Sequence, residues 1–135
     1  MEYAEEVGLK LLRPPFIPCS LPALEAAEYA REQGKFDQYH LAVFKAYWEE
    51  AKNIGFRDVL LQVAQDSGLD VKEVESCLDS GRYAKLVKQH SEEAKQSGIG
   101  GIPSYIIGDH LLEGAQPYPV FQRAVESMGI KRKLE

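Results

Sequence analysis

The sequence predicts a mostly α-helical protein with one small β-hairpin near its C-terminal end. Between Ser20 and Ser97, apolar residues recur at the three- and four-residue spacing of helices that bury one face. After Gly98 this period gives way to two short apolar runs, IPSYIIG and HLLEG, which meet at Gly108-Asp109. Gly-Asp between two strand-forming runs is typical of a tight hairpin with a primed turn.

The first helix is predicted from its start and stop signals. The preceding segment, LLRPPFIPCS, has three prolines within five residues and therefore predicts an extended loop. Ser20 is a favourable N-cap for LPALEAAEYAREQG, Pro22 lies in the first turn, and Gly34 supplies the end.

The next segment, FDQYHLAVFKAYWEEAK, predicts a helix with a wide aromatic face. One side carries apolar residues at helical spacing, and four further ring-bearing residues adjoin it: Tyr39, Val43, Ala46 and Tyr47, then Phe36, His40, Phe44 and Trp48. We expect this face to pack inside a helical subdomain, with His40 a packed, hydrogen-bonded core residue rather than a catalyst.

Three more helices precede the hairpin, and one follows it. FRDVLLQVAQDSG ends at Gly68, Asp70 caps VKEVESCLDSG, and RYAKLVKQHSEEAKQSG is more polar. Cys77 adjoins the apolar stripe of its helix and is expected to behave as a small hydrophobic residue. YPVFQRAVESMG, after Pro117, predicts the final helix.

Composition narrows the class of function. A chain of 135 residues suits one domain with a modest core, and its net charge of −5 argues against general nucleic-acid binding. No function is assigned to the basic KRK at 131–133. No apolar run is long enough to span a membrane, and MEYAEEVGLK has no apolar leader stretch, so we expect a cytoplasmic protein.

The cysteines and histidines predict neither a metal site nor a catalytic group. Cys19 and Cys77 are 58 residues apart and neither belongs to a CxxC, while His40, His90 and His110 are dispersed. Cys19 directly precedes a helix start, which favours thiolate, but it lacks a resolving partner. We therefore expect no cofactor, no metal ion and no catalytic residue within this chain.

The order of these segments resembles the DsbA-like thioredoxin-fold proteins, and in particular the cytoplasmic FrnE-type subgroup of predicted dithiol-disulfide isomerases. The resemblance covers roughly residues 8 to 128, and its most specific pieces are GIGGIPSYIIG and GAQPYPVF. It implies an incomplete thioredoxin-like α/β fold that carries a helical insertion. The implied parts are an N-terminal segment and loop (1–19), the insertion (20–89), the C-terminal part of the thioredoxin-like core (90–129) and a tail (130–135).

The resemblance also implies a substrate site. Pro103 stands at the position of the family's cis-proline, so Gly101, Ile102 and Pro103 are the expected substrate-binding residues. The family's reactive CxxC lies after the first strand, and this sequence begins downstream of that point. The chain is therefore expected to be related to protein thiol-disulfide oxidoreductases and isomerases, yet not redox-active alone.

The same resemblance predicts that the chain pairs with a second polypeptide. In a thioredoxin arrangement the strand after the cis-proline pairs with the first strand, so Ser104–Ile107 would present an unpaired edge. We expect a homodimer, or completion by another polypeptide, with the Pro103–Ile107 edge at the junction. Pairing through the aromatic face of Phe36–Trp48 is the alternative geometry.

Two other functions remain open from the sequence. One is a glutathione-dependent relative of the 2-hydroxychromene-2-carboxylate isomerases or kappa-class transferases, in which a serine replaces the CxxC. The other is a non-catalytic module that binds peptides or only pairs with itself. Protein or peptide thiols are the expected substrates of the leading alternative.

Overall fold

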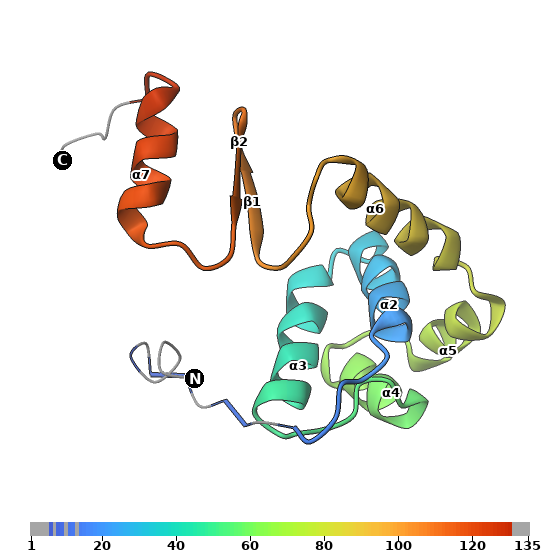
Figure 1. Ribbon diagram of the computed structural model, residues 1–135. Helices are drawn as coiled ribbons and strands as arrows, with labels where there is room; N and C mark the ends of the chain where they lie inside the picture. The colour runs from blue at the N-terminus through green and yellow to red at the C-terminus, as the bar shows by residue number, and fades with distance from the viewer. Residues whose placement is uncertain (1–5, 7, 10, 13, 131–135) are drawn as a thin grey trace. The chain divides into compact units, whose positions relative to one another are not determined.

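The computed structural model describes residues 6, 8, 9, 11, 12 and 14–130. The predicted tail therefore lies, apart from Ile130, outside the described residues, as does the KRK cluster. The fold is mostly helical with a two-stranded antiparallel sheet, as predicted (Figure 1). The elements are α2 (Leu21–Glu32), α3 (Phe36–Trp48), α4 (Arg57–Asp66), α5 (Val71–Ser80), α6 (Ala84–Gln96), β1 (Ser104–Ile107), β2 (His110–Glu113) and α7 (Tyr118–Ser127).

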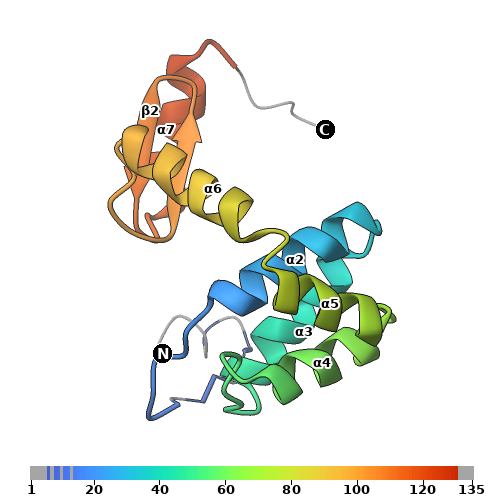
Figure 2. The ribbon, with the colours of Figure 1, turned by 90° about the vertical axis from the view of Figure 1, so that its right-hand side faces the viewer.

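The chain divides into two compact units, Met1–Gln89 and His90–Glu135. In the first unit α2 contacts α3, α4 and α5, and α4 contacts both α3 and α5 (Figures 1 and 2). In the second unit β1 and β2 form the hairpin.

The core of the first unit is built around the small side chains of α2. Its inward residues are all buried and are alanines, apart from one tyrosine: Ala23, Ala26, Ala27, Tyr29 and Ala30. Small side chains let the neighbouring helices approach closely, and the largest fully buried side chains, Tyr39, Leu60 and Val74, come from those neighbours. The Tyr39 hydroxyl donates to the carbonyl oxygen of Ala23 over 3.4 Å. Burial raises the pKa of this phenol.

The predicted cap of α5 is confirmed. One Asp70 carboxylate oxygen accepts from the backbone N–H groups of Lys72 at 2.9 Å and Glu73 at 3.2 Å. At the other end Gly81 takes a left-handed conformation with φ of 60°. At the start of α2, Ser20 occupies the expected N-cap position but its side chain makes no capping hydrogen bond. Its backbone is already in the right-handed helical region, so the hydroxyl is not placed to reach the first turn.

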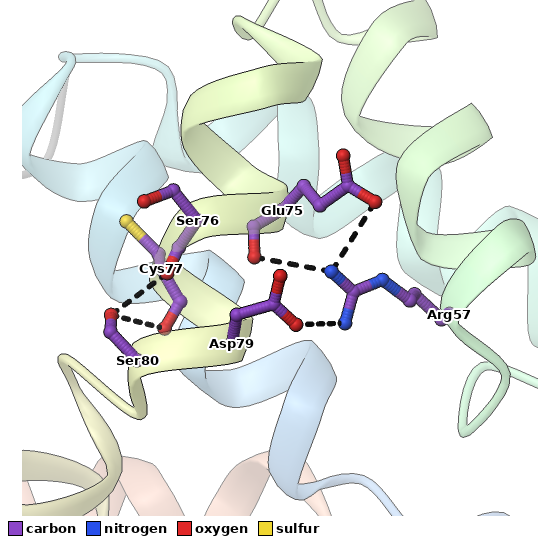
Figure 3. A network of polar contacts seen from close by, with 6 residues as sticks. All are labelled: Arg57, Glu75, Ser76, Cys77, Asp79 and Ser80. Carbon is purple, nitrogen blue, oxygen red and sulfur yellow. Dashed lines mark hydrogen bonds and ion pairs between the residues drawn. The ribbon is translucent and has the colours of Figure 1, made fainter.

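An exposed ion-pair network links α4 to α5 (Figure 3). Arg57 contacts the Asp79 carboxylate at 2.6 Å and the Glu75 carboxylate at 3.3 Å, and its guanidinium also donates to the Glu75 carbonyl. The hydrogen bond from Arg57 holds the pKa of Asp79 below its usual value. Because all three side chains are exposed to solvent, the network contributes little to the stability of the fold.

Two expectations for the aromatic helix are wrong. The helix ends at Trp48 rather than continuing through Lys52, and Ala51 beyond it has a positive φ of 52°. His40 is exposed rather than packed in the core: its ring lies between those of Phe36 and Phe44 along the surface of α3. Only Tyr39 and Ala46 of this helix are buried among the described residues.

Leu60→Ala tests the core of the first unit. Leu60 is fully buried, so the variant leaves a cavity and should lower the free energy of unfolding by about 2–5 kcal/mol. Urea unfolding followed by the fluorescence of Trp48, the single tryptophan of the sequence, measures this change. Leu24→Ala, at a half-exposed position on α2, is the control and should cost below about 0.5 kcal/mol. Equal unfolding of the two variants would contradict this description of the core.

Candidate functional site: the proline loop and the edge of β1

The candidate site begins where α6 ends. The chain leaves the helix at Gly98, whose φ is 79°, and the N–H groups of Gly98 and Ile99 donate to the carbonyl oxygens of Lys95 and Ala94, each over 3.0 Å. The loop that follows, Gly100–Pro103, leads directly into β1. Within it the Ile102–Pro103 peptide bond is cis.

The loop is held by the far end of β2. The Gly114 N–H donates to the Pro103 carbonyl oxygen at 2.8 Å, which extends the hairpin ladder by one pair. The Gly100 N–H reaches the Glu113 carboxylate at 3.4 Å, and the Ser104 hydroxyl donates to the Gly101 carbonyl oxygen at 2.6 Å. The loop backbone is thus fixed, although its side chains face solvent.

Gly101, Ile102 and Pro103, the expected substrate-binding residues, are all exposed. Ile102 is the extreme case, since 95% of its surface is accessible. Nothing lies within 4 Å of the position that a Gly101 Cβ would occupy. The structure therefore brings these three residues together on one accessible loop, and their role as a binding site stays a prediction.

The register of the hairpin determines which backbone groups of β1 are free. Ile107 pairs with His110 across the two-residue turn, and Ser104 pairs with Glu113. In an antiparallel ladder, hydrogen-bonded and non-hydrogen-bonded pairs alternate, so Tyr105 and Ile107 direct their N–H and C=O groups toward β2, as the Pro103 carbonyl does. Ser104 and Ile106 direct theirs to the opposite edge, where the described residues supply no strand.

Helix α7 supports one face of the hairpin. The Tyr105 ring meets the Phe121 ring edge-on, with centroids 4.9 Å apart. His110 Nε2 lies 2.7 Å from the Ser127 hydroxyl oxygen. Because that hydroxyl donates to the Ala124 carbonyl at 2.7 Å, its oxygen is left to accept from the His110 N–H. Ile106 and Leu111 pair on the other face and are exposed.

Sequence reasoning missed the residues that hold the loop, namely Glu113, Gly114 and Gln116, whose side-chain amide donates to the Glu113 carbonyl oxygen at 2.6 Å. A signal for them was present. A two-residue turn at Gly108-Asp109 fixes the pairing of the residues on either side of it. Counting residues outward from the turn therefore places Ser104 opposite Glu113 and Pro103 opposite Gly114.

Neither cysteine belongs to this loop. Cys19 is exposed and precedes α2, while Cys77 is buried within α5; both are free thiols. Among the described residues, His, Cys, Asp and Glu side chains form no group of three that could hold a metal ion. In the same part of the chain, every helix is too short or too polar to cross a membrane.

Comparison with known proteins gives the family. Residues 2–126 match the DSBA-like thioredoxin domain. The chain belongs to this DSBA-like thioredoxin family. The expectation drawn from the sequence is therefore confirmed at the level of the family and its fold.

Individual proteins are similar to this chain over part or most of its length. The uncharacterized protein YwbO of Bacillus subtilis is 32% identical over 125 residues, which are 90% of this chain and 62% of YwbO. The ClpXP adapter protein SpxH of Halalkalibacterium halodurans is 29% identical over 84 residues, 57% of this chain and 28% of that protein. The crystal structure of the probable DsbA oxidoreductase SCO1869 from Streptomyces coelicolor superposes with a TM-score of 0.84 at 24% identity. That match covers 99% of this chain and 59% of the Streptomyces chain, so this DSBA-like chain spans about three fifths of YwbO and of SCO1869.

Gly108→Ala tests the turn that fixes the register of the site. Gly108 has a positive φ of 57° while Asp109 does not, the combination that a type II′ turn requires. An added Cβ would also lie 2.9 Å from the Met128 sulfur, which would have to move. We expect a local loss of about 1–2 kcal/mol, seen as roughly tenfold faster hydrogen exchange at Tyr105 and Ile107.

Gly101→Ala is the matched control for this experiment. Its φ is not positive and open space surrounds its Cβ position, so exchange in β1 should stay at the wild-type rate. Equal acceleration in both variants would show that the turn geometry does not govern the register.

Proposed function

We propose that this chain supplies the substrate-binding part of a protein thiol-disulfide oxidoreductase or isomerase of the FrnE type. The observation that carries the proposal is the free edge of β1 beside the exposed Ile102. An extended peptide can pair with such an edge through main-chain hydrogen bonds, while neighbouring side chains select among peptides. Gly101, Ile102 and Pro103 then form the start of the peptide-binding surface.

The backbone groups on this edge support binding in register. Ser104 and Ile106 each offer one N–H donor and one C=O acceptor on the side away from β2. The loop before them is fixed by Gly114 and Glu113, so little ordering is needed when a peptide docks. The flanking side chains, Ile102 and Ile106, are exposed and apolar, and therefore favour an apolar segment of the peptide.

The proposal leaves the redox step to a dithiol that this chain does not contain. Thiol-disulfide exchange needs an attacking thiolate and a second thiol that resolves the mixed disulfide. Cys77 is buried and Cys19 has no cysteine near it in sequence, so the two do not provide such a pair. We place the protein in the cytoplasm, because two unpaired thiols suit a reducing compartment.

The same edge is proposed as an assembly surface. A strand from a second copy, or from another polypeptide, would satisfy the same outward groups of β1 over Pro103–Ile107, so it would compete with a substrate peptide for this edge. A two-stranded sheet is marginal in water, and a third strand stabilises it. The Phe36–Trp48 face of α3 offers a separate surface for association.

Insulin reduction by dithiothreitol tests the redox part of the proposal. We expect the full chain to leave the rate of dithiothreitol alone unchanged within error, because the chain has no paired thiols. Cys77→Ser, which removes a buried thiol, is the control for Cys19→Ser. An acceleration that Cys19→Ser abolishes would contradict the proposal. Tight binding of reduced glutathione by calorimetry would instead favour the glutathione-dependent alternative.

Hydrogen exchange along β1 tests the free edge. Tyr105 and Ile107 donate to β2, so their amides should be protected at every protein concentration and serve as internal controls. The Ser104 and Ile106 amides should exchange rapidly in the dilute chain and slow by roughly tenfold or more as the strand gains a partner across the micromolar range. Protection of all four amides at high dilution would refute a free edge. Rapid exchange of the outer pair at the highest concentration would refute self-pairing.

A further inference from the structure

A second exposed apolar surface lies on α3, in the unit Met1–Gln89. Tyr39 and Ala46 face the core, and the helix side opposite them carries Leu41, Phe44 and Trp48 at spacings of three and four residues. Leu41 is 68% exposed and Phe44 51% exposed. Surface helices usually place polar residues on this side, so the apolar stripe requires an explanation.

The rings along this surface are held in order before any partner binds. Phe36, His40 and Phe44 follow one another at four-residue spacing, with ring centroids 5.2 Å and then 4.6 Å apart. The Arg31 guanidinium lies 3.9 Å over the Phe36 ring and fixes the first member of the row. Aromatic side chains already packed on one another lose little freedom on docking.

The apolar stripe continues past the end of the helix. Trp48 packs edge-on against Tyr47, with centroids 4.7 Å apart, and both line a shallow apolar groove with the Pro14–Ile17 segment. The Tyr47 hydroxyl donates to the Phe16 carbonyl at 3.1 Å and holds that segment against the helix. Ile17, beside the groove, is 95% exposed.

The charges that flank the stripe indicate its partner. Asp37 lies one turn before Leu41, and Lys45 lies one turn after it, on the same side of the helix and both exposed. When such a helix packs antiparallel on its own copy about a two-fold axis at Leu41, each Asp37 faces the other copy's Lys45. Parallel packing would instead oppose like charges. The pattern is therefore self-complementary in one orientation only.

We propose that α3 packs antiparallel against α3 of a second copy of this chain, with Leu41 and Phe44 at the centre and two Asp37–Lys45 pairs at the rim. Lys45 is available for this contact, since its ion pair with Glu50 is long, at 3.9 Å, and its side chain is 63% exposed. The interface goes beyond the proposed function. It uses neither the proline loop nor the edge of β1.

Charge reversal gives the decisive experiment. In Asp37→Lys the two rim contacts become Lys–Lys, and in Lys45→Asp they become Asp–Asp, so each variant alone should self-associate roughly tenfold or more weakly than wild type at low salt. An equal mixture of the two variants restores both contacts with opposite charges and should associate as wild type does. Sedimentation velocity of each variant and of the mixture measures this.

A substitution at the centre of the proposed interface gives a test that does not depend on the Asp37–Lys45 ion pairs. Leu41→Glu places two charges at the two-fold axis and should weaken the association roughly tenfold or more, to what the β1 edge alone supports, whereas Leu24→Glu, half-exposed on α2, should leave it intact. The proposal is overturned if the mixed charge variants stay as weak as each alone, or if Leu41→Glu associates normally. Exchange at the Ser104 and Ile106 amides is read in the same samples. It should not respond to any α3 variant, so failure here is distinct from failure of the proposed function.

Discussion

The alternation of hydrogen bonding along β1 governs what the second unit can do. A strand has two rows of backbone groups, and β2 satisfies the row that belongs to Pro103, Tyr105 and Ile107. The other row, from Ser104 and Ile106, has no strand beside it within the described residues. One residue of slippage at the Gly108-Asp109 turn would exchange the two rows, so the turn decides which backbone groups of β1 face away from β2.

The first unit is organised around the small side chains of α2. Alanines on α2 let α3, α4 and α5 approach it closely, and the largest fully buried side chains, Tyr39, Leu60 and Val74, come from those helices. Tyr39 and Ala46 of α3 are buried and Phe36 and Tyr47 pack partly buried against the core, whereas the rings of His40 and Phe44 stay exposed. The aromatic content of α3 thus exceeds what the unit buries. The excess is arranged in one ordered row rather than scattered over the surface.

Features that depend on local chemistry could be predicted from the sequence, whereas features that depend on tertiary packing could not. Helix ends such as Asp70 and Gly81 and the hairpin turn were predictable, because each follows from the local chemistry of a cap or a positive φ. The exposure of His40 was not predictable, because the apolar and aromatic face of α3 is wide and such a pattern usually indicates a helix enclosed by others. Which side is covered depends on tertiary neighbours. Ser20 makes no capping hydrogen bond because its backbone is already in the right-handed helical region, which its residue type alone does not reveal.

Binding and chemistry are separable in this arrangement. A strand edge recognises backbone groups that every extended peptide shares, so under the proposed function the affinity supplied by β1 would not depend on where a peptide's cysteine lies. Selection then rests on the side chains beside the edge, Ile102 and Ile106, which are apolar and exposed. Thiol exchange adds a geometric demand, because an attacking sulfur must reach a disulfide held on that edge. Cys77 cannot meet this demand, since burial within α5 shields its sulfur from any peptide. A chain with this edge and without a reactive thiol pair would hold a peptide without altering it, and chemistry would follow only where a dithiol is brought to the proline loop.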